Sequence, residues 1–293
     1  MQHKFQGLGV AMVTPFSANG SVDYDGLTSL TEHLINGGVD YLVVQGTTGE
    51  SATMNLKEKQ DVLEHVKKIN AGRKPIVFGH GGNNTAALVE GFKNFDWNGV
   101  DAILSASPYY NKPTQEGIYQ HYKALNEATP RPIILYNVPG RTSSNITAST
   151  TLRMANDFEN IIAVKEASGD LGQISQILKS CPADFTVLSG DDPLVVPHIA
   201  VGGHGVISVI GNALPKTFST MTHQALNGDY ENARQLHLRL LVGIDMLFAE
   251  GNPGGIKAAL KARGICGDTV RLPLVNISSE LYNKIEAEFQ GLD

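Results

Sequence analysis

The chain of 293 residues contains little of what marks several large classes of protein. Its two cysteines, Cys181 and Cys266, are too few and too far apart for a disulfide framework or a CxxC metal site, so a reducing cytoplasm is the expected location. There is no block of Lys and Arg, and the formal net charge is −6. This charge pattern argues against nucleic acid or an anionic membrane surface as a partner.

Other signals are missing as well. No apolar run approaches the length of a membrane span, and residues 1–6 lack the apolar core of a signal peptide, so we expect no membrane association. The nine histidines show no HxH or HExxH spacing, so we expect no metal site. His80 and His204 lie beside glycines at predicted strand ends, and we expect both to be structural residues lining the mouth of the site.

What is present is an ordinary globular composition, 42% hydrophobic and 18% charged, with apolar runs that recur regularly. The predicted strands are Gly9–Val13, Tyr41–Val44, Pro75–Phe78, Ala102–Leu104, Pro132–Leu135, Ile161–Val164, Phe185–Leu188 and Gly205–Val209. Between them lie segments with helical spacing, such as Tyr24–Ile35, Lys57–Ile69, Ala86–Phe95 and Gly117–Ala128.

Apolar strands that alternate with helices indicate a parallel sheet covered on both faces. Eight of them predict a (β/α)8 TIM barrel of the α/β class. A doubly wound open sheet is the competing interpretation. It usually shows a glycine-rich fingerprint after the first strand, and Val13-Thr14-Pro15-Phe16 does not resemble one.

After the eighth predicted strand the alternation stops, and the pattern is helical. The predicted helices there are Lys216–Leu226, Asp229–Phe248, Gly254–Arg263 and Ser278–Phe289. We therefore expect a catalytic barrel over residues 1–228 and a C-terminal helical appendage over residues 229–293, with the boundary near Gly228 and Asp229.

One lysine carries the main chemical hypothesis. Lys165 follows the apolar residues Ile161–Val164 and so ends a predicted buried strand. Burial of a charge is costly unless something compensates it, which favours the neutral amine. A neutral, desolvated lysine attacks carbonyl carbon and forms a Schiff base. The competing interpretation is a strand-end lysine that reaches water or pairs with Glu166.

Barrel enzymes carry their chemistry at the carboxyl ends of the strands. The segments at these ends, besides Lys165, are Gly46–Ser51, Ser107–Tyr110, Tyr136–Thr142, Ser189–Asp192 and Ile207–Ser208. They supply hydroxyls, backbone N–H groups and one guanidinium, which is enough for carbonyl chemistry without a cofactor.

Two of these segments also have a structural interpretation. The turn Gly46–Glu50 suits a small carboxylate or phosphate, or it caps the next helix through Ser51 or Thr53. The adjacent Asp191 and Asp192 are expected to cap a helix.

Two further side chains remain open in the same way. Tyr136 ends a strand one step round the barrel from Lys165, where its phenol would move protons, or it is a core tyrosine. Arg141 offers a fork for a carboxylate, or it is a solvated surface arginine.

In chain order the motifs are Gly46-Thr47-Thr48-Gly49-Glu50, Tyr136-Asn137-Val138-Pro139-x-Arg141-Thr142, Val164-Lys165-Glu166-Ala167 and Gly203-His204-Gly205-Val206-Ile207-Ser208. Together they resemble the pyruvate-dependent class I aldolases of the N-acetylneuraminate lyase superfamily, and within it the dihydrodipicolinate synthase family. The resemblance runs from Val13-Thr14-Pro15 to Arg271-Leu272-Pro273.

The resemblance implies a role for each site residue. The implied catalytic residues are Lys165, which would form an imine with pyruvate, and the proton relay of Tyr136, Thr47 and Tyr110. The implied substrate-binding residues are Thr48, Arg141, Gly190 and Ile207. Thr48 would hold the pyruvate carboxylate, Arg141 would hold the carboxylate of L-aspartate 4-semialdehyde, and Tyr110 would reach into a neighbouring subunit's site. A homotetramer built from tight dimers is also implied.

The implied reaction is a lyase-type condensation of pyruvate with L-aspartate 4-semialdehyde to 4-hydroxy-tetrahydrodipicolinate, in lysine and diaminopimelate biosynthesis. A same-fold lyase for a 2-keto-3-deoxy sugar acid or N-acetylneuraminate is the nearest alternative, but such relatives usually lack an arginine at the position of Arg141. A non-catalytic relative would have lost Lys165 or Tyr136. A phosphate-binding barrel enzyme would need a glycine-rich loop after strands seven and eight.

The resemblance also bears on regulation, because lysine inhibits many bacterial members from a site at the dimer interface. The residues here that match that site are Ser51, Ala52, Asn83 and Tyr109. Two histidines of the family site are replaced by Leu56 and Lys59, and its acidic residue by Ala87. Lys59 adds a like charge, and Ala87 leaves the bound ammonium unpaired. We therefore expect a vestigial effector site and weak or absent inhibition by lysine.

Overall fold

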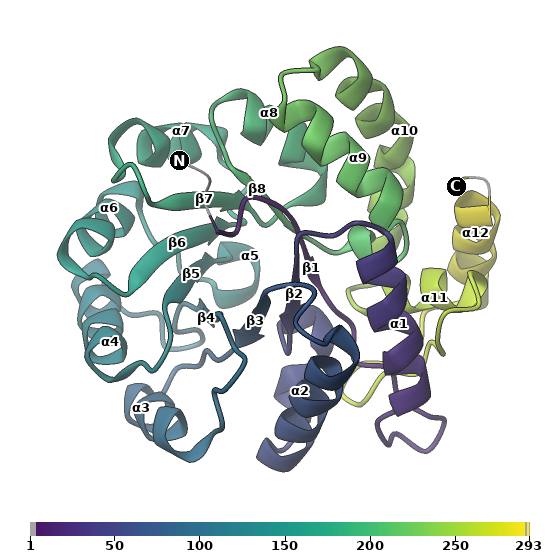
Figure 1. Cartoon of the computed structure of the whole chain (residues 1–293), viewed down its shortest axis with the longest axis horizontal. Coiled ribbons are helices and arrows are strands. Elements are labelled where there is room, and N and C mark those ends of the chain that lie inside the picture. Colours follow the sequence, from purple (N-terminus) through teal and green to yellow (C-terminus); the bar gives the residue numbers. More distant parts are fainter. Residues whose placement is uncertain (1–3, 291, 293) are drawn as a thin grey trace.

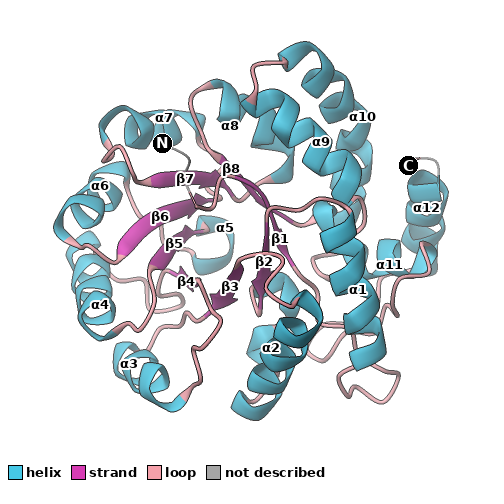
Figure 2. Cartoon of the chain, in the orientation of Figure 1, coloured by secondary structure: helices cyan, strands magenta, loops and turns pink. Residues whose placement is uncertain are grey.

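The structure, a computed structural model, describes residues 4–290 and residue 292. Its strands are β1 (Gly7–Ala11), β2 (Tyr41–Val44), β3 (Ile76–Gly79), β4 (Ala102–Ala106), β5 (Ile133–Asn137), β6 (Ile161–Glu166), β7 (Thr186–Ser189) and β8 (Gly205–Ser208). Each strand pairs in parallel with the next, and β8 pairs with β1, so the sheet closes into a barrel. Helices surround it on the outside (Figures 1 and 2). The predicted (β/α)8 barrel is confirmed.

Every predicted strand is present, but the prediction for the first one is two residues too late. The strand ends early because the Val13 N–H donates to Oδ1 of Asn212 at 3.1 Å. It begins early because two glycines let β1 and β8 approach closely. A Cβ on Gly205 would lie 2.1 Å from the carbonyl oxygen of Gly7, and Gly7 itself has a φ of +97°.

The helices are α1 (Tyr24–Asn36), α2 (Leu56–Asn70), α3 (Thr85–Asn94), α4 (Gln115–Ala128), α5 (Pro139–Thr142), α6 (Ala148–Asp157), α7 (Leu171–Ser180), α8 (Val195–Ala200), α9 (Pro215–Leu226), α10 (Tyr230–Phe248), α11 (Gly254–Ala262) and α12 (Ser279–Gln290). The short 3₁₀ turns are η1 (Thr47–Gly49), η2 (Ser51–Thr53), η3 (Asp192–Leu194) and η4 (Ile210–Asn212).

The start of α2 corrects one expectation. Its N-cap is Asn55, whose side chain accepts from the Glu58 N–H, while the Glu58 carboxylate accepts from the Asn55 N–H in a capping box. Ser51 and Thr53 belong instead to η2. The turn after β2 is therefore not a helix cap.

Apolar side chains form two layers. One packs between the strands and the helices, and the other fills the inside of the barrel with residues such as Tyr41, Val43, Leu104 and Leu188. The inner packing is tight, because a Cβ on Gly9 would lie 2.1 Å from the Tyr41 ring. The interior is therefore a solid core, and polar chemistry is confined to the barrel ends.

The chain continues after β8 with helices α9 to α12, which confirms the predicted helical C-terminal segment. Helix α9 packs against both β1 and α10, and α11 packs against α10 and α12. Because α9 contacts both parts, the division between residues 228 and 229 stays a prediction. Within the described residues, no helix is long and apolar enough to span a membrane.

A histidine on α9 ties this helix to the barrel. Nε2 of His223 donates to Oδ2 of Asp40 at 2.9 Å, and the same oxygen accepts the Leu8 N–H of β1 at 2.7 Å. The hydrogen bond to Asp40 raises the pKa of His223 above its usual 6.5. The pair of protonated His223 with Asp40 therefore stabilises the fold fully below about pH 6.5, and this contribution is lost as the pH rises through the raised pKa.

We expect His223→Gln to lower the midpoint of thermal unfolding more at about pH 5.5 than at about pH 8.5, because glutamine keeps a donor but not the charge. His65→Gln is the control, since His65 bonds a hydroxyl, Thr28 Oγ1 at 2.8 Å, and not a carboxylate. Equal losses for His223→Gln at the two pH values would show that the histidine charge does not contribute.

Candidate active site

Lys165 lies one residue from the carboxyl end of β6, and its side chain is almost fully enclosed, at 5% exposed. Its Nζ lies 4.3 Å from the centroid of the Tyr136 ring. Among residues 4–290 and 292, no acidic group forms an ion pair with it. The side chain is enclosed and not extended into solvent, so the first part of the structural alternative for Lys165 is wrong.

The second part fails too, because Glu166 faces away from Lys165. Consecutive strand residues point to opposite faces, and the Glu166 carboxylate lies between the sheet and the helices. It accepts from Nδ2 of Asn137 at 3.0 Å, Nε2 of Gln173 at 2.8 Å and the Ser168 N–H at 2.8 Å. These donors satisfy the Glu166 carboxylate, which therefore forms no ion pair with the Lys165 amine.

Tyr136 and Gly190 complete the surroundings of the amine. Tyr136 on β5 is the register partner of Lys165, so both project into the barrel in one layer. A Cβ on Gly190 would lie 2.9 Å from Cε of Lys165 and 2.7 Å from Cβ of Ala167. Only glycine leaves room for the lysine there. Ile207 on β8 is fully buried in the same inner layer as Tyr136.

The turn after β2 is held in a strained conformation. Gln45 and Glu50, which bracket it, have φ angles of 59° and 54°. A left-handed non-glycine residue costs about 1–3 kcal/mol and persists where its surroundings hold it. Within the turn Thr47 is exposed, whereas Thr48 is buried, with 3% of its surface exposed.

The C-terminal appendage supplies the restraint. Nζ of Lys257 on α11 pairs with the Glu50 carboxylate, and both side chains are fully buried. The same Nζ donates to the Thr269 carbonyl at 2.8 Å, and the Arg271 N–H donates to Glu50 Oε2 at 2.9 Å. Burial lowers the pKa of Lys257, and Glu50 opposes this shift. Residues more than 200 positions away thus hold the turn after β2.

Asn252, between α10 and α11, reaches the same turn and donates from Nδ2 to Thr48 Oγ1 at 3.0 Å. Asn252 and Lys257 were not predicted from the sequence. Lys257 had a signal, because it interrupts an apolar helix much as Lys165 ends an apolar strand. Asn252 had none, since Gly-Asn-Pro is typical of an ordinary turn.

Arg141 lies in the short helix α5 after β5 and is exposed. In the described part of the chain, its guanidinium has no hydrogen-bond or ion-pair partner. Its five donors are therefore available to an anion.

Tyr110 is not enclosed by the rest of the site. It follows β4 with a φ of 71°, and 89% of its surface is exposed. Tyr109 beside it is partly exposed, and its carbonyl accepts from Nδ2 of Asn83 at 3.3 Å. This bond joins two of the four residues that match the effector site; the other two, Ser51 and Ala52, lie in η2.

The aspartates after β7 differ from each other. Asp192 accepts from the N–H groups of Val209 and Ile210 at 2.9 and 2.8 Å, so it caps η4. Asp191 makes no capping bond. Burial raises its pKa, and nearby Lys165 opposes this shift. The expected capping role therefore holds for Asp192 alone.

The strand-end histidines also differ. Nε2 of His80, after β3, bonds the Leu88 carbonyl at 3.1 Å, which fits a structural residue. His204 precedes β8, and its Nδ1 accepts from the Val187 N–H at 3.0 Å. It lies at the amino end of the barrel, so the expectation that it lines the mouth is wrong.

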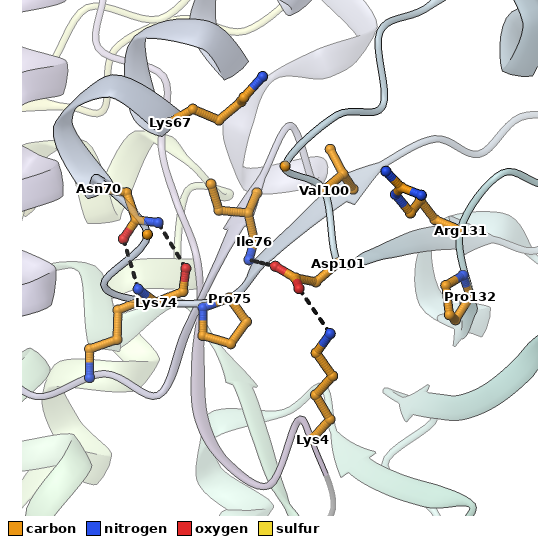
Figure 3. Close-up of a pocket in the computed structure, with 12 residues that line it drawn as sticks. Lys4, Lys67, Asn70, Lys74, Pro75, Ile76, Val100, Asp101, Arg131 and Pro132 are labelled. Atoms are coloured by element: carbon orange, nitrogen blue, oxygen red, sulfur yellow. Dashed lines mark hydrogen bonds and ion pairs between the residues drawn. The ribbon is translucent and has the colours of Figure 1, made fainter.

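An open pocket of about 800 Å³ lies at the amino ends of β3, β4 and β5 (Figure 3). Its charged lining is Lys4, Lys67, Lys74, Asp101 and Arg131. Asp101 accepts from Lys4 Nζ and the Ile76 N–H, each at 2.8 Å, which ties the start of β3 to the chain start. Because β6 runs parallel to these strands and carries Lys165 near its carboxyl end, this pocket is remote from the lysine.

An enclosed lysine facing a tyrosine, at the end of the barrel where such enzymes carry their chemistry, defines a lyase of the class I aldolase type. The chain matches the dihydrodipicolinate synthetase family over residues 4–291. It therefore belongs to that family, and the resemblance inferred from the motifs is confirmed.

Individual relatives agree along the whole chain. The 4-hydroxy-tetrahydrodipicolinate synthase of Flavobacterium psychrophilum is 51% identical over 282 residues, 96% of each chain. A solved dihydrodipicolinate synthase of Acinetobacter baumannii, complexed with pyruvate, is 37% identical over 98% of each chain, with a TM-score of 0.94. The enzyme of Cyanidioschyzon merolae with lysine bound is 38% identical, covers 99% of this chain and 100% of that one, and has a TM-score of 0.94.

The contribution of the buried ion pair of Lys257 and Glu50 to stability can be tested by mutation. Lys257→Met leaves the Glu50 carboxylate buried without a counter-charge, so we expect the free energy of unfolding to fall by about 3–5 kcal/mol. Replacing both residues, as Glu50→Gln with Lys257→Met, removes both charges and should recover part of the loss. Urea unfolding followed by circular dichroism measures both effects.

The control is Lys261→Met, one turn further along α11. Lys261 pairs with Asp268 at 3.0 Å at the surface, and exposed pairs contribute less than about 1 kcal/mol. Equal free energies of unfolding for Lys257→Met and Lys261→Met would show that the buried pair of Lys257 and Glu50 does not stabilise the fold.

Proposed function

We propose that this chain condenses pyruvate with L-aspartate 4-semialdehyde to 4-hydroxy-tetrahydrodipicolinate, a step of lysine and diaminopimelate biosynthesis. The observation that carries the proposal is the enclosed Lys165 amine, which faces Tyr136 and forms no ion pair within the described residues. Relatives of about half identical sequence carry the name of this synthase, which supports it over a sugar-acid lyase. Cys181 and Cys266 are free thiols, so we propose the cytoplasm as the location.

Lys165 supplies the covalent steps. Its Nζ attacks the carbonyl carbon of pyruvate, and loss of water leaves a protonated imine that draws electrons from the methyl group. Loss of a methyl proton gives an enamine, and the enamine carbon attacks the aldehyde. The amino group of the adduct then attacks the imine carbon, closes the ring and releases Lys165. Bonds and protons balance without any oxidation, so no cofactor is needed.

We assign the proton transfers to Tyr136, Thr47 and Tyr110. Tyr136 is beside the amine, and Thr47 is exposed at the start of η1. Tyr110 projects from the surface of its own chain, so we assign it to the site of a neighbouring subunit. This assignment requires a tight dimer, and we propose a homotetramer made of two such dimers.

We assign substrate binding to the groups around the relay. The buried Thr48 receives the pyruvate carboxylate, and the unpaired guanidinium of Arg141 receives the carboxylate of the aldehyde substrate. Gly190 and Ile207 shape the pocket, since Gly190 leaves room for Lys165 and Ile207 closes the inner layer.

Replacement of the nucleophile tests the proposal. Lys165→Ala should lower the turnover of pyruvate with L-aspartate 4-semialdehyde by at least about 10²-fold, because the imine cannot form. A nicotinamide-dependent reductase of the product reports the turnover. Borohydride reduction in the presence of pyruvate should add one reduced pyruvyl group to the wild-type chain and none to Lys165→Ala, as read by mass spectrometry.

Lys179→Ala, on the exposed surface of α7, is the matched control and should retain both turnover and adduct. An adduct without turnover would redirect the assignment to a lyase for a sugar acid, tested with polyhydroxylated aldehydes. Folded wild-type protein that forms no adduct would refute the Schiff-base mechanism itself.

The effector site yields a separate prediction. Lys59 is half-buried, and burial lowers its pKa, so a second ammonium beside it is unfavourable. Ala87 offers no carboxylate in exchange. We expect lysine to inhibit weakly or not at all, and half-inhibition well below about 1 mM, a binding free energy beyond about −4 kcal/mol, would contradict this.

A gain-of-function variant sharpens the test. Lys59→His with Ala87→Glu removes the like charge and supplies an acid, so it should gain inhibition by lysine. Lys57→His with Ala86→Glu, one or two positions away on the same helices, keeps the net change in charge and should gain none.

A further inference from the structure

Among the described residues of the appendage, Asn252 is the one polar group that forms a hydrogen bond to a predicted substrate-binding residue. Only 8% of it is exposed, and its Nδ2 donates to Thr48 Oγ1 at 3.0 Å across 204 positions of sequence. In the described chain this is the only hydrogen bond of the Thr48 side chain. The geometry therefore gives Asn252 control over the Thr48 hydroxyl.

The direction of the bond decides what the hydroxyl offers. A threonine hydroxyl has one proton and two lone pairs. Because the Asn252 amide donates into a lone pair, the proton of Thr48 must point elsewhere, and no described residue accepts it. The hydroxyl is thus held as a free donor, the form that a carboxylate needs.

Both ends of this bond are held in place. On the barrel side, Glu50 lies two residues after Thr48 and is gripped by Lys257 and by the Arg271 N–H. On the appendage side, a Cβ on Gly255 would lie 2.3 Å from the Leu247 carbonyl, so the segment after Asn252 packs directly against α10. The bond therefore joins two restrained segments rather than two mobile loops.

We propose that Asn252 is a positioning residue that presents the Thr48 hydroxyl to the carboxylate of pyruvate. The inference rests on the proposed function and deepens it, because it assigns part of substrate recognition to the appendage. Asn252 acts through Thr48 and does not itself take part in the covalent steps.

Steady-state kinetics with pyruvate as the varied substrate test this. One hydrogen bond to a charged group corresponds to a change of about 10–100-fold in affinity. We expect Asn252→Ala to raise KM for pyruvate by about 10-fold or more while kcat changes by less than about 3-fold, because Lys165 is untouched. Asn283→Ala, an exposed asparagine of α12, is the control and should change neither.

A double-mutant cycle separates positioning from general structural damage. If Asn252 acts only through the hydroxyl, Thr48→Val alone and Thr48→Val with Asn252→Ala should have the same KM for pyruvate. Additive effects on KM would overturn the proposal, as would an unchanged KM in Asn252→Ala.

If Asn252→Ala fails to fold, the nearly isosteric Asn252→Asp replaces it. An aspartate accepts rather than donates, so it captures the Thr48 proton and should raise KM at least as much as alanine. An unchanged KM in folded Asn252→Asp would equally refute the proposal. Borohydride trapping of pyruvate on the wild-type protein distinguishes failure of the proposed function from failure of the role of Asn252. If the wild-type protein forms no adduct, the proposed function is refuted, and the inference about Asn252 is refuted with it. If the adduct forms but KM for pyruvate is unchanged in the variants, only the role of Asn252 is refuted.

Discussion

Closure of eight parallel strands is the constraint on which the site depends. The register of the barrel sets Tyr136 opposite Lys165 and Lys165 opposite Leu188, so one layer is built from three strands. The tightly packed interior lies below that layer, and only 5% of the Lys165 surface is exposed. Because Glu166 is turned to the outer face, its carboxylate does not pair with Lys165. Lys165 differs from a surface lysine because it is enclosed and forms no ion pair among the described residues.

The second feature on which the site depends is the set of contacts between the appendage and the turn after β2. The turn carries left-handed residues at Gln45 and Glu50, a conformation that needs outside support. The pair of Glu50 and Lys257 gives that support in a fully buried setting, where loss of either charge is expensive. Asn252, which lies just before α11, donates a hydrogen bond to Thr48 in the same turn. The C-terminal segment therefore contacts directly the turn that carries the predicted substrate-binding residue Thr48.

The parts of this architecture that sequence patterns revealed are those with local causes. Strands of a parallel barrel are apolar on both faces, so each appears as a short apolar run whatever its partners are. Lys165 was visible for the same reason, as a charge at the end of such a run. The errors have long-range causes. The limits of β1 depend on Asn212 and on contact between Gly7 and Gly205, and the cap of α2 is Asn55 because the preceding turn is held elsewhere.

The sequence by itself determined the barrel and the helical C-terminal segment and marked Lys165 as the predicted nucleophile, because hydrophobic period and burial are recorded residue by residue. Only the tertiary structure decided which groups meet. It turned Glu166 away from the lysine, placed Tyr110 outside its own chain's core, and brought Asn252 and Lys257 to a turn more than 200 residues earlier. Such contacts depend on the closed register of the sheet and on the packing of α9 to α12 against it, and no local pattern encodes either.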